Sequence, residues 1–464
     1  MSIDSNIEFP FQTMEYQKFG EIVGDNRFPS ITSTNIDYYG KQKTEVFPKF
    51  AVLTYDIGQN QSSQPINSLP FGNSAATDAF GRLRVSLPDT LHNAKQIVDN
   101  VPYVYSNGTA GTAEIYYDSN NASSVLAVSA NNDIAIRQTK AYMNYQPGKS
   151  QLAFITFVCV GSADVTQRVG IFDSETSNPY SNLEGFYFEI NNGSYSVNIA
   201  NLGGSNSLSA AQASWNIDKL DGTGASEITL DTNKTQILVI DYEWLGVGRV
   251  RFGFNIDGII YYCHEFRNSN NLTLPYLSNP NKPVRYECRS TGGVGSIRHI
   301  CSSVASEGGS QDNGVPHAIH SGSSGIGNIS DSTEFPAVTI RLKEAYKSFN
   351  IRLQNFSCMA AANTNSIAKI ILNGTILGPA KTFTEKADSC IEYYFGTSTD
   401  VLSGGTELYT TYFNKTSLPA NFVSDSLLTL GTTVDGVRDT ITLVLVPCGG
   451  QEKYFSSLNW LELL

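Results

Sequence analysis

The stretch Gln236–Phe266 constrains the fold of this chain more than any other, because apolar and polar residues alternate through three short runs. In the middle run, 247–256, every second residue is apolar from Val250 on, and arginines occupy positions between them. Leu245-Gly246 and Asp257-Gly258 separate the runs as tight turns. Alternation with a period of two places the apolar residues on one face of a strand. The stretch is therefore predicted to be an antiparallel meander with one buried face, as in one sheet of a β-sandwich.

Runs of the same kind occur on both sides of a Gly/Ser-rich stretch at 305–332. Strands are expected at 101–105, 113–117, 150–160, 168–172, 185–190 and 194–199 before it, and at 337–342, 348–357, 367–372, 390–395 and 440–446 after it. The run 456–460 is expected to be an edge strand that packs Trp460. Helix signals are confined to a turn or two at Thr90–Asp99 and Leu342–Lys347.

These patterns predict an all-β chain in four parts. Residues 1–95 are expected to be an extended N-terminal arm, because their aromatic residues and prolines follow no sustained period. A first β-sandwich is expected over 96–304, a Gly/Ser-rich linker or loop over 305–332, and a C-terminal β-sandwich over 333–464. Aromatic residues are uncommon in disordered segments, so the arm is expected to pack on something else.

Composition excludes several classes of function. Only 16% of the 464 residues are charged and the net charge is -12, so nucleic acid, which needs Lys and Arg to neutralise phosphates, is not an expected partner. No apolar run reaches the roughly 18 residues of a membrane span. Residues 1–10 have neither the basic nor the apolar region of a secretory signal.

A pair of carboxylates in the meander has two interpretations. Asp241 and Glu243 share one face of a strand at a spacing of two, as an acid–base pair of a glycan-cleaving sandwich would. Arg249 and Arg251 lie across the turn on what is predicted to be the same face. Opposite charges across neighbouring strands are ordinary sheet stabilisers. The sequence favours ion pairing, and no catalytic residue is assigned.

Metal and cofactor signals are weak. His299 and Cys301, or the adjacent Cys263 and His264, offer nitrogen and sulfur ligands, but adjacent residues of a strand face opposite sides and structural zinc needs four ligands. No metal or cofactor is therefore expected. The seven cysteines form no CxxC pair and their number is odd, so free, mostly buried thiols are predicted.

Aromatic residues of the meander are candidates for stacking on sugars. Tyr242, Trp244, Tyr261 and Tyr262 would serve if they lay on an exposed strand face. For each of them, packing in the core is the competing interpretation.

Two longer blocks resemble a family of proteins. The segment Ala79–Leu91 resembles a block near the N-terminus of structural proteins from tailed phages and large DNA viruses, although the Phe-Asp-Ser-Lys that usually follows it is absent here. The segments within 215–266 resemble a second block of the same proteins, and 457–463 resembles their C-terminal end. The motif positions, expected to be structural, are Phe80, Gly81, Arg82, Arg84, Trp215, Asp218, Asp221, Gly222, Gly246, Arg249 and Arg251.

The resemblance implies a fold and a function. It implies a concanavalin-like jelly-roll sandwich followed by a smaller sandwich, in a non-enzymatic virion component made in the host cytoplasm. The expected partners are other virion proteins and copies of the chain itself, and its position could be capsid, vertex or spike, tail or fibre. A module that binds host surface glycans for attachment is the alternative, and a glycan-cleaving enzyme is the third possibility.

Overall fold

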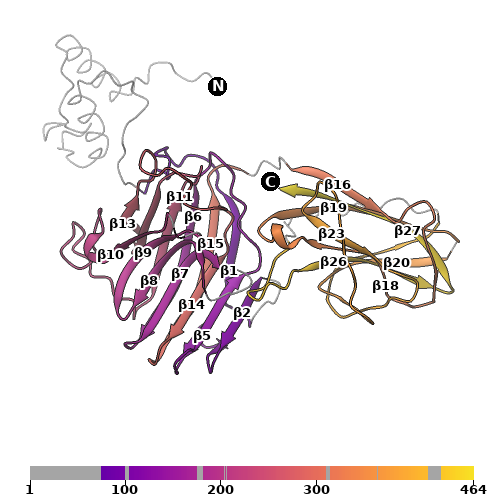
Figure 1. Cartoon of the computed structure of the whole chain (residues 1–464), viewed down its shortest axis with the longest axis horizontal. Coiled ribbons are helices and arrows are strands. Elements are labelled where there is room, and N and C mark those ends of the chain that lie inside the picture. The colour runs from indigo at the N-terminus through magenta and orange to yellow at the C-terminus, as the bar shows by residue number, and fades with distance from the viewer. Residues whose placement is uncertain are drawn as a thin grey trace, which may run out of the picture. The chain divides into compact units, whose positions relative to one another are not determined.

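The computed structural model describes residues 75–99, 104–174, 181–202, 204, 206–309, 314–362, 364–415 and 430–463. These residues form β-strands and two short helical turns, η1 (Gln212–Ser214) and η2 (Glu344–Tyr346) (Figure 1). The predicted all-β class is confirmed. The part of the predicted arm before residue 75 lies outside the described residues. Within them, no helix is long and apolar enough to cross a membrane.

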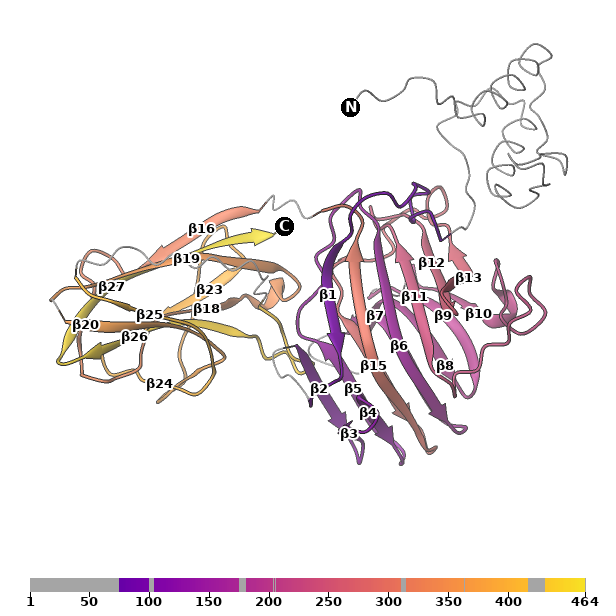
Figure 2. The ribbon, with the colours of Figure 1, turned by 180° about the vertical axis from the view of Figure 1, so that it is seen from behind.

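An eight-stranded antiparallel sheet forms one layer of the first sandwich (Figure 2). Its strands follow the order β13-β12-β11-β6-β15-β4-β3. β4 pairs with residues 295–299 of β15, and β1 pairs with residues 301–306 of the same strand. The bounds are β1 (Asp89–Lys95), β3 (Glu114–Asp118), β4 (Ser123–Val128), β6 (Gln151–Gly161), β11 (Gln236–Tyr242), β12 (Val250–Ile256), β13 (Ile259–Phe266) and β15 (Gly295–Ser306). The predicted meander is the run β11-β12-β13, so its three strands are confirmed.

A seven-stranded antiparallel sheet forms the second layer, in the order β10-β9-β8-β7-β14-β5-β2. The bounds are β2 (Tyr105–Ala110), β5 (Ile134–Thr139), β7 (Val165–Ser174), β8 (Leu183–Asn191), β9 (Ser194–Ala200), β10 (Leu208–Ala211) and β14 (Val284–Ser290). Alternate residues of both sheets meet in one core, where Phe157 and Phe252 from the first sheet and Phe186 and Phe188 from the second are buried. The predicted jelly-roll sandwich is confirmed by this arrangement of strands.

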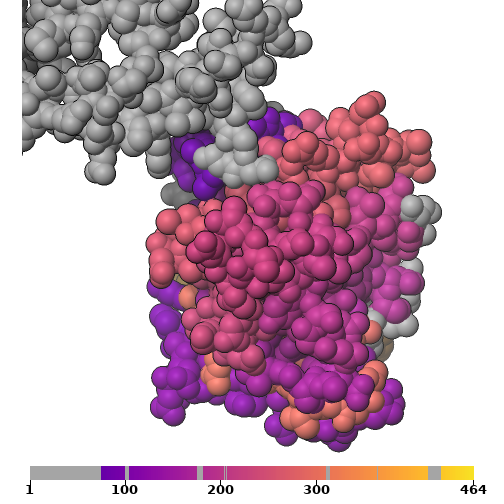
Figure 3. Space-filling model, turned by 90° about the vertical axis from the view of Figure 1, so that its left-hand side faces the viewer, coloured from indigo at the N-terminus to yellow at the C-terminus, as the bar shows by residue number. Residues whose placement is uncertain are grey.

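The segment between β10 and β11 closes one end of this sandwich. Trp215, Leu220 and Leu230 of this segment are buried in the same core as the strands. Figure 3 looks at the first sandwich from this side, where residues coloured magenta to pink cover most of the face that is shown. The motif residue Trp215 is therefore a core residue, and its indole Nε1 donates to the Ala210 carbonyl oxygen at 3.1 Å.

The second sandwich packs a four-stranded sheet, with β16, β17 and β19 all pairing with β27, on a six-stranded sheet in the order β22-β23-β18-β26-β20-β25. The bounds are β16 (Val315–His320), β17 (Ile326–Ile329), β18 (Phe335–Leu342), β19 (Asn350–Ala360), β20 (Asn365–Leu372), β22 (Thr384–Glu385), β23 (Ile391–Phe395), β25 (Thr406–Phe413), β26 (Thr440–Cys448) and β27 (Glu452–Leu463). A two-stranded ribbon pairs β21 (Thr375–Ile376) with β24 (Leu402–Ser403). Trp460 and Phe356 lie in the core of this sandwich.

Strands β4, β5, β10, β14 and β25 were not predicted from the sequence, and three predicted segments have a different structure. Residues 89–95 are not arm or helix, because they pair with 301–306 and extend the first sandwich. The Gly/Ser-rich stretch is not only a linker, since β15 runs to Ser306 and β16 and β17 both pair with β27. The run 456–460 is not an edge strand, because β16 pairs on one side of it and β19 on the other. In each case the partner is distant in sequence.

Polar contacts join the two sandwiches. The Lys140 Nζ lies 2.9 Å from Asp439 Oδ1, and both side chains are almost fully buried. The Lys140 carbonyl oxygen accepts from the Thr432 backbone N–H at 3.0 Å. The Asn350 side chain donates to the Tyr142 carbonyl oxygen at 3.0 Å.

Three histidines of the first sandwich are held in their neutral form. Burial lowers the pKa of His92 and of His264 to about 4. Burial and the neighbouring Arg137 hold the pKa of His299 well below its usual range. His299 stacks on Tyr286 with 4.1 Å between ring centroids, and its Nδ1 accepts a hydrogen bond from Arg137 Nε.

We expect the free energy of unfolding of the first sandwich to fall as the pH decreases from about 6.5 to about 4. In this window the unfolded chain binds protons at these imidazoles and the folded chain does not, which costs about 1.4 kcal/mol per unit of pKa difference at each site. Urea unfolding at a series of pH values measures the effect. His320→Asn, a change at an exposed histidine, should leave the slope unchanged. A flat profile between pH 4.5 and 6.5 would contradict the prediction.

Candidate functional site

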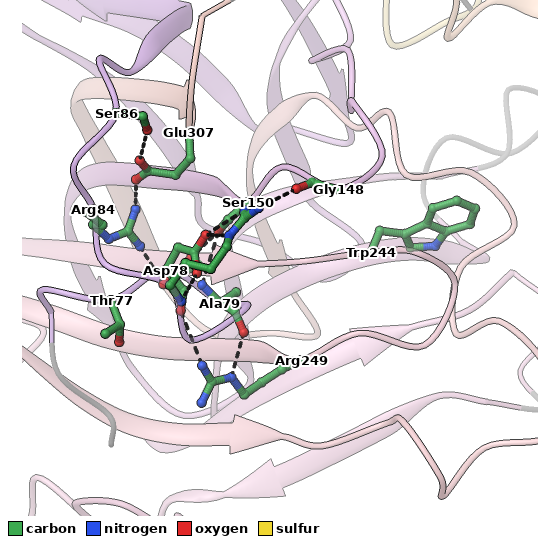
Figure 4. A network of polar contacts seen from close by, with 12 residues as sticks. Thr77, Asp78, Ala79, Arg84, Ser86, Gly148, Ser150, Trp244, Arg249 and Glu307 are labelled. Atoms are coloured by element: carbon green, nitrogen blue, oxygen red, sulfur yellow. Dashed lines mark hydrogen bonds and ion pairs between the residues drawn. The ribbon is translucent and has the colours of Figure 1, made fainter. Parts of the chain in front are cut away.

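The two sequence blocks that resemble one family meet on the outer face of the eight-stranded sheet (Figure 4). Residues 75–88, which we call the strap, lie against β11 and β12 there. The Arg249 guanidinium donates to the carbonyl oxygens of Asp78 and Ala79 at 3.3 and 3.0 Å. Arg251 donates to the Thr77 carbonyl oxygen at 2.6 Å. Arginines of the second block therefore hold the backbone of the first.

Asp241 lies at the centre of this contact with no exposed surface. Its carboxylate accepts from Arg84 Nη2 at 2.7 Å, from Ser150 Oγ at 2.8 Å and from the Tyr262 hydroxyl at 3.1 Å. It also accepts from Arg251, its partner directly across the β11–β12 pair. The predicted ion pair between Asp241 and Arg251 is confirmed, and an arginine of the strap joins it.

The strap makes further ion pairs along its length. Arg84 also pairs with Glu307, which in turn accepts from Ser86 Oγ at 3.2 Å. Arg82 pairs with Asp78 and donates to the Gly148 carbonyl oxygen at 3.0 Å. The guanidinium of Arg82 lies 4.4 Å from the centre of the Phe80 ring. Gly81 turns the chain with a φ of 81°, a value that favours glycine.

Asp241 and Glu243 do not form an open pair of carboxylates. Asp241 is buried and fully engaged, as described above. Glu243 accepts from the Arg249 backbone N–H at 2.9 Å, and burial raises the pKa of its carboxyl group. The Arg249 side chain pairs instead with Glu265, at 3.2 Å. Asp241 is therefore ion-paired and closed to a substrate, whereas the ion pair predicted for Glu243 does not form among the described residues, because the Arg249 guanidinium binds Glu265.

The four aromatic candidates mostly belong to the core. Tyr242 and Tyr262 are buried, and Tyr261 and Trp244 are half-buried against the core of the first sandwich. Tyr242 is covered because it faces Phe186 of the opposite sheet, with 4.6 Å between the ring centres. Core packing, the competing interpretation, therefore describes them better than stacking on sugar.

The remaining motif residues shape loops. Asp218 accepts from the backbone N–H groups of Leu220 and Ser226, at 2.9 and 2.7 Å. Asp221 accepts from the Thr223 backbone N–H at 2.9 Å. Gly222 and Gly246 turn the chain, with φ values of 84° and 82°. These contacts are structural.

No group of three or more His, Cys, Asp or Glu side chains in the described ranges could hold a metal ion. All seven cysteines are free, which confirms that prediction. Cys263 faces the core, while His264 Nδ1 accepts from the Asn216 backbone N–H at 3.2 Å.

The outer face of the seven-stranded sheet carries a second polar group, which the sequence interpretation missed. Arg168 of β7 lies directly between Glu189 of β8 and Glu287 of β14 and pairs with both, at 2.6 and 2.8 Å. Arg285 and Arg289 of β14 also pair with Glu287. The alternation of Arg285, Glu287 and Arg289 with core residues was the signal that could have revealed this face.

This polar face keeps groups that can bind a ligand. Burial by itself raises the pKa of Glu287, but Arg285, Arg168 and Arg289 outweigh it and lower the pKa to about 2. The side chains of Arg168, Glu189 and Arg289 remain 18%, 16% and 26% exposed, so solvent reaches them. The buried Arg289 Nη2 has no hydrogen-bond partner in the part of the chain that is described.

No protein-family model and no curated protein matches this chain. Among solved structures it is similar to the carbohydrate recognition domain of Emp47p (14% identity, 51% of this chain and 100% of that one, TM-score 0.30). It is also similar to a Bacillus licheniformis beta-glucanase (8%, 47% and 97%, 0.30) and to a legume lectin-like domain from Entamoeba histolytica (12%, 43% and 89%, 0.27). At these identities and TM-scores, none of the three assigns a family or a function to this chain.

Replacing Asp241 with Asn is expected to lower the free energy of unfolding by about 3–5 kcal/mol, because two buried guanidinium groups lose their shared counter-charge. The strap should also become more accessible, so trypsin should cut faster after Arg82 or Arg84. Denaturant unfolding and peptide mapping measure the two effects. Asp257→Asn, an exposed change in the β12–β13 turn, is the control. Equal stability and equal resistance of the two variants would contradict this role of Asp241.

Proposed function

We propose that this protein binds carbohydrate without cleaving it, and that the polar face of the seven-stranded sheet is the binding surface. The observation that carries the proposal is the group of Arg168, Glu189, Arg289 and Tyr187 on neighbouring strands of one partly exposed face. Sugars present many hydroxyl groups in fixed directions. Arginine donors and carboxylate acceptors held rigidly side by side can bind such groups in pairs.

Tyr187 is 9% exposed and supplies an uncommitted hydroxyl. Its ring packs on Phe172 with 5.0 Å between centroids, and the Arg168 guanidinium lies 5.7 Å from its centre. Within the described residues its hydroxyl makes no hydrogen bond. Beside it on β9, Asn198 donates only to Ser196 Oγ, at 3.0 Å, which leaves its amide oxygen for a ligand. The face thus combines the partly exposed charges of Arg168, Glu189 and Arg289 with two polar groups that no described residue engages, the Tyr187 hydroxyl and the Asn198 amide oxygen.

The charges of this face argue for binding rather than hydrolysis. A general acid must hold a proton near the working pH. Three arginines keep Glu287 ionised, with a pKa of about 2, and Arg168 is paired with Glu189 as well. Glu287 is fully buried and holds the arginines in place, while the partly exposed Glu189 is the carboxylate that can accept hydrogen bonds from sugar hydroxyls.

Tyr187→Phe is expected to weaken saccharide binding about five- to tenfold, because it removes one hydrogen bond to the ligand and no intramolecular one. Binding is measured with the full chain on a glycan array and then by calorimetry with the strongest ligand. Tyr116→Phe, at a half-exposed tyrosine of β3, is the matched control. The proposal fails if no glycan binds, or if the two variants bind equally well.

A second candidate function, assembly into a virus particle, has its own observation. Leu83, Val85 and Leu87 of the strap are 47%, 85% and 85% exposed, while Arg84 between them is tied to the sheet. A rigid segment with exposed apolar side chains is typical of a protein–protein contact. Together with the resemblance to virion proteins, this supports a role as a virion component that contacts copies of itself or other virion proteins.

If the strap mediates self-assembly, the purified chain should sediment as an oligomer. Replacing Leu83, Val85 and Leu87 together with Ser should then yield monomers of unchanged thermal stability, since these side chains contribute little to the core. Analytical ultracentrifugation and thermal unfolding measure both. An oligomer that survives the triple replacement would exclude this contact.

A further inference from the structure

The outer face of the eight-stranded sheet carries an open groove of about 450 Å³, next to the strap and on the opposite side of the sandwich from the polar face. Its floor consists of two rows of side chains that run across neighbouring strands. One row contains Lys95 of β1, Cys301 of β15, Thr156 of β6 and Ile237 of β11, each directly opposite the next.

The second row begins with Asn93 of β1 and continues through Ser303 of β15 to Phe154 of β6. The groove therefore has an apolar centre, Phe154 and Ile237, between polar margins. Asn255 of β12 adds an amide at the margin away from β1.

The strap decides where this groove begins. The next row across the same strands contains Leu152 and Asp241, and there Arg84 of the strap fills the space above the sheet. No residue of the strap lines the rows at Phe154 and Thr156. The strap thus closes the groove at the row of Leu152 and Asp241, and it does not cover the rows of Phe154 and Thr156.

The polar margins have hydrogen-bonding capacity to spare. The side chains of Asn93, Lys95, Thr156, Asn255 and Ser303 make no hydrogen bond or ion pair with the residues that the structure describes. This contrasts with Asp241, one row away, which accepts from four donors. Side-chain amides and hydroxyls donate and accept at once, as sugar hydroxyls do, so the two match. An aromatic ring between them offers the apolar face that a sugar ring packs on.

We propose that this groove is a second saccharide site, with a sugar ring on Phe154 and its hydroxyls bound by Thr156, Ser303 and Asn255. The inference rests on the proposed carbohydrate-binding function and adds a site to it. The two sites lie on the outer faces of opposite sheets. One chain can therefore hold two saccharide chains at the same time and bridge them.

The test counts saccharides per chain. Immobilised glucose, galactose and mannose oligosaccharides are screened with the full chain, and the free oligosaccharide that binds best is titrated by calorimetry. We expect two per chain. The double change Phe154→Leu and Asn255→Ala should weaken the groove site at least tenfold, leaving one. Tyr187→Phe should weaken only the other site, and Asn120→Ala, at an exposed turn, should change neither.

Each other outcome overturns a specific claim. One saccharide per chain, unaffected by the double change but weakened by Tyr187→Phe, overturns the groove site and leaves the proposed function standing. One saccharide that only the double change removes overturns the site on the polar face. No binding by a folded chain overturns both. A dimer that the double change dissociates would identify the groove as a contact between copies and overturn the inference. Thermal unfolding confirms that each variant folds.

Discussion

The buried carboxylate of Asp241 organises the first sandwich beyond its core. Two guanidinium groups, from Arg84 and Arg251, converge on this carboxylate, which has no exposed surface. Arg251 already balances the charge of Asp241, and Arg84 of the strap adds a second guanidinium that Glu307 balances in turn, so the strap is held where both ion pairs of Arg84 form. The strap in turn fixes where the sheet is covered and where it stays open. The proposed groove and the exposed apolar side chains of the strap both follow from this one contact.

The two outer faces of the first sandwich differ in how their charged and polar side chains are paired. On the seven-stranded sheet, Glu287 is surrounded by three arginines and the charges are mutually satisfied, yet Tyr187 and Arg289 keep free donors. On the eight-stranded sheet, ion pairs gather under the strap and between Arg298 and Asp118, and the groove beside the strap is neutral apart from Lys95. Both faces present fixed polar groups that no described residue engages, and the groove adds the half-buried ring of Phe154. A carbohydrate-binding role needs such groups and needs no cofactor.

Much of the fold could be predicted because alternation is a local property. The meander β11-β12-β13 and the pairing of Asp241 with Arg251 follow from two local signals: apolar and polar residues alternate with a period of two, and two tight turns separate the runs. β1 and β15 were missed. In β15 serines interrupt the apolar alternation, and a bulge between His299 and Cys301 shifts its register. Core packing, the competing interpretation, describes Tyr242 and Tyr262, which are buried, because alternation assigns a residue to a face but does not say what covers that face.

The sequence by itself determined the all-β class and the strands and turns of the ion-paired meander, since these depend on alternation among neighbouring residues. Only the tertiary structure decided that the two motif blocks meet, because Arg84 and Asp241 are 157 residues apart. It also decided which faces are open. Arg168, Glu189 and Glu287 come from three strands and become one surface only when these strands lie side by side in the sheet. Register between distant strands results from packing of the whole core, which no local pattern encodes.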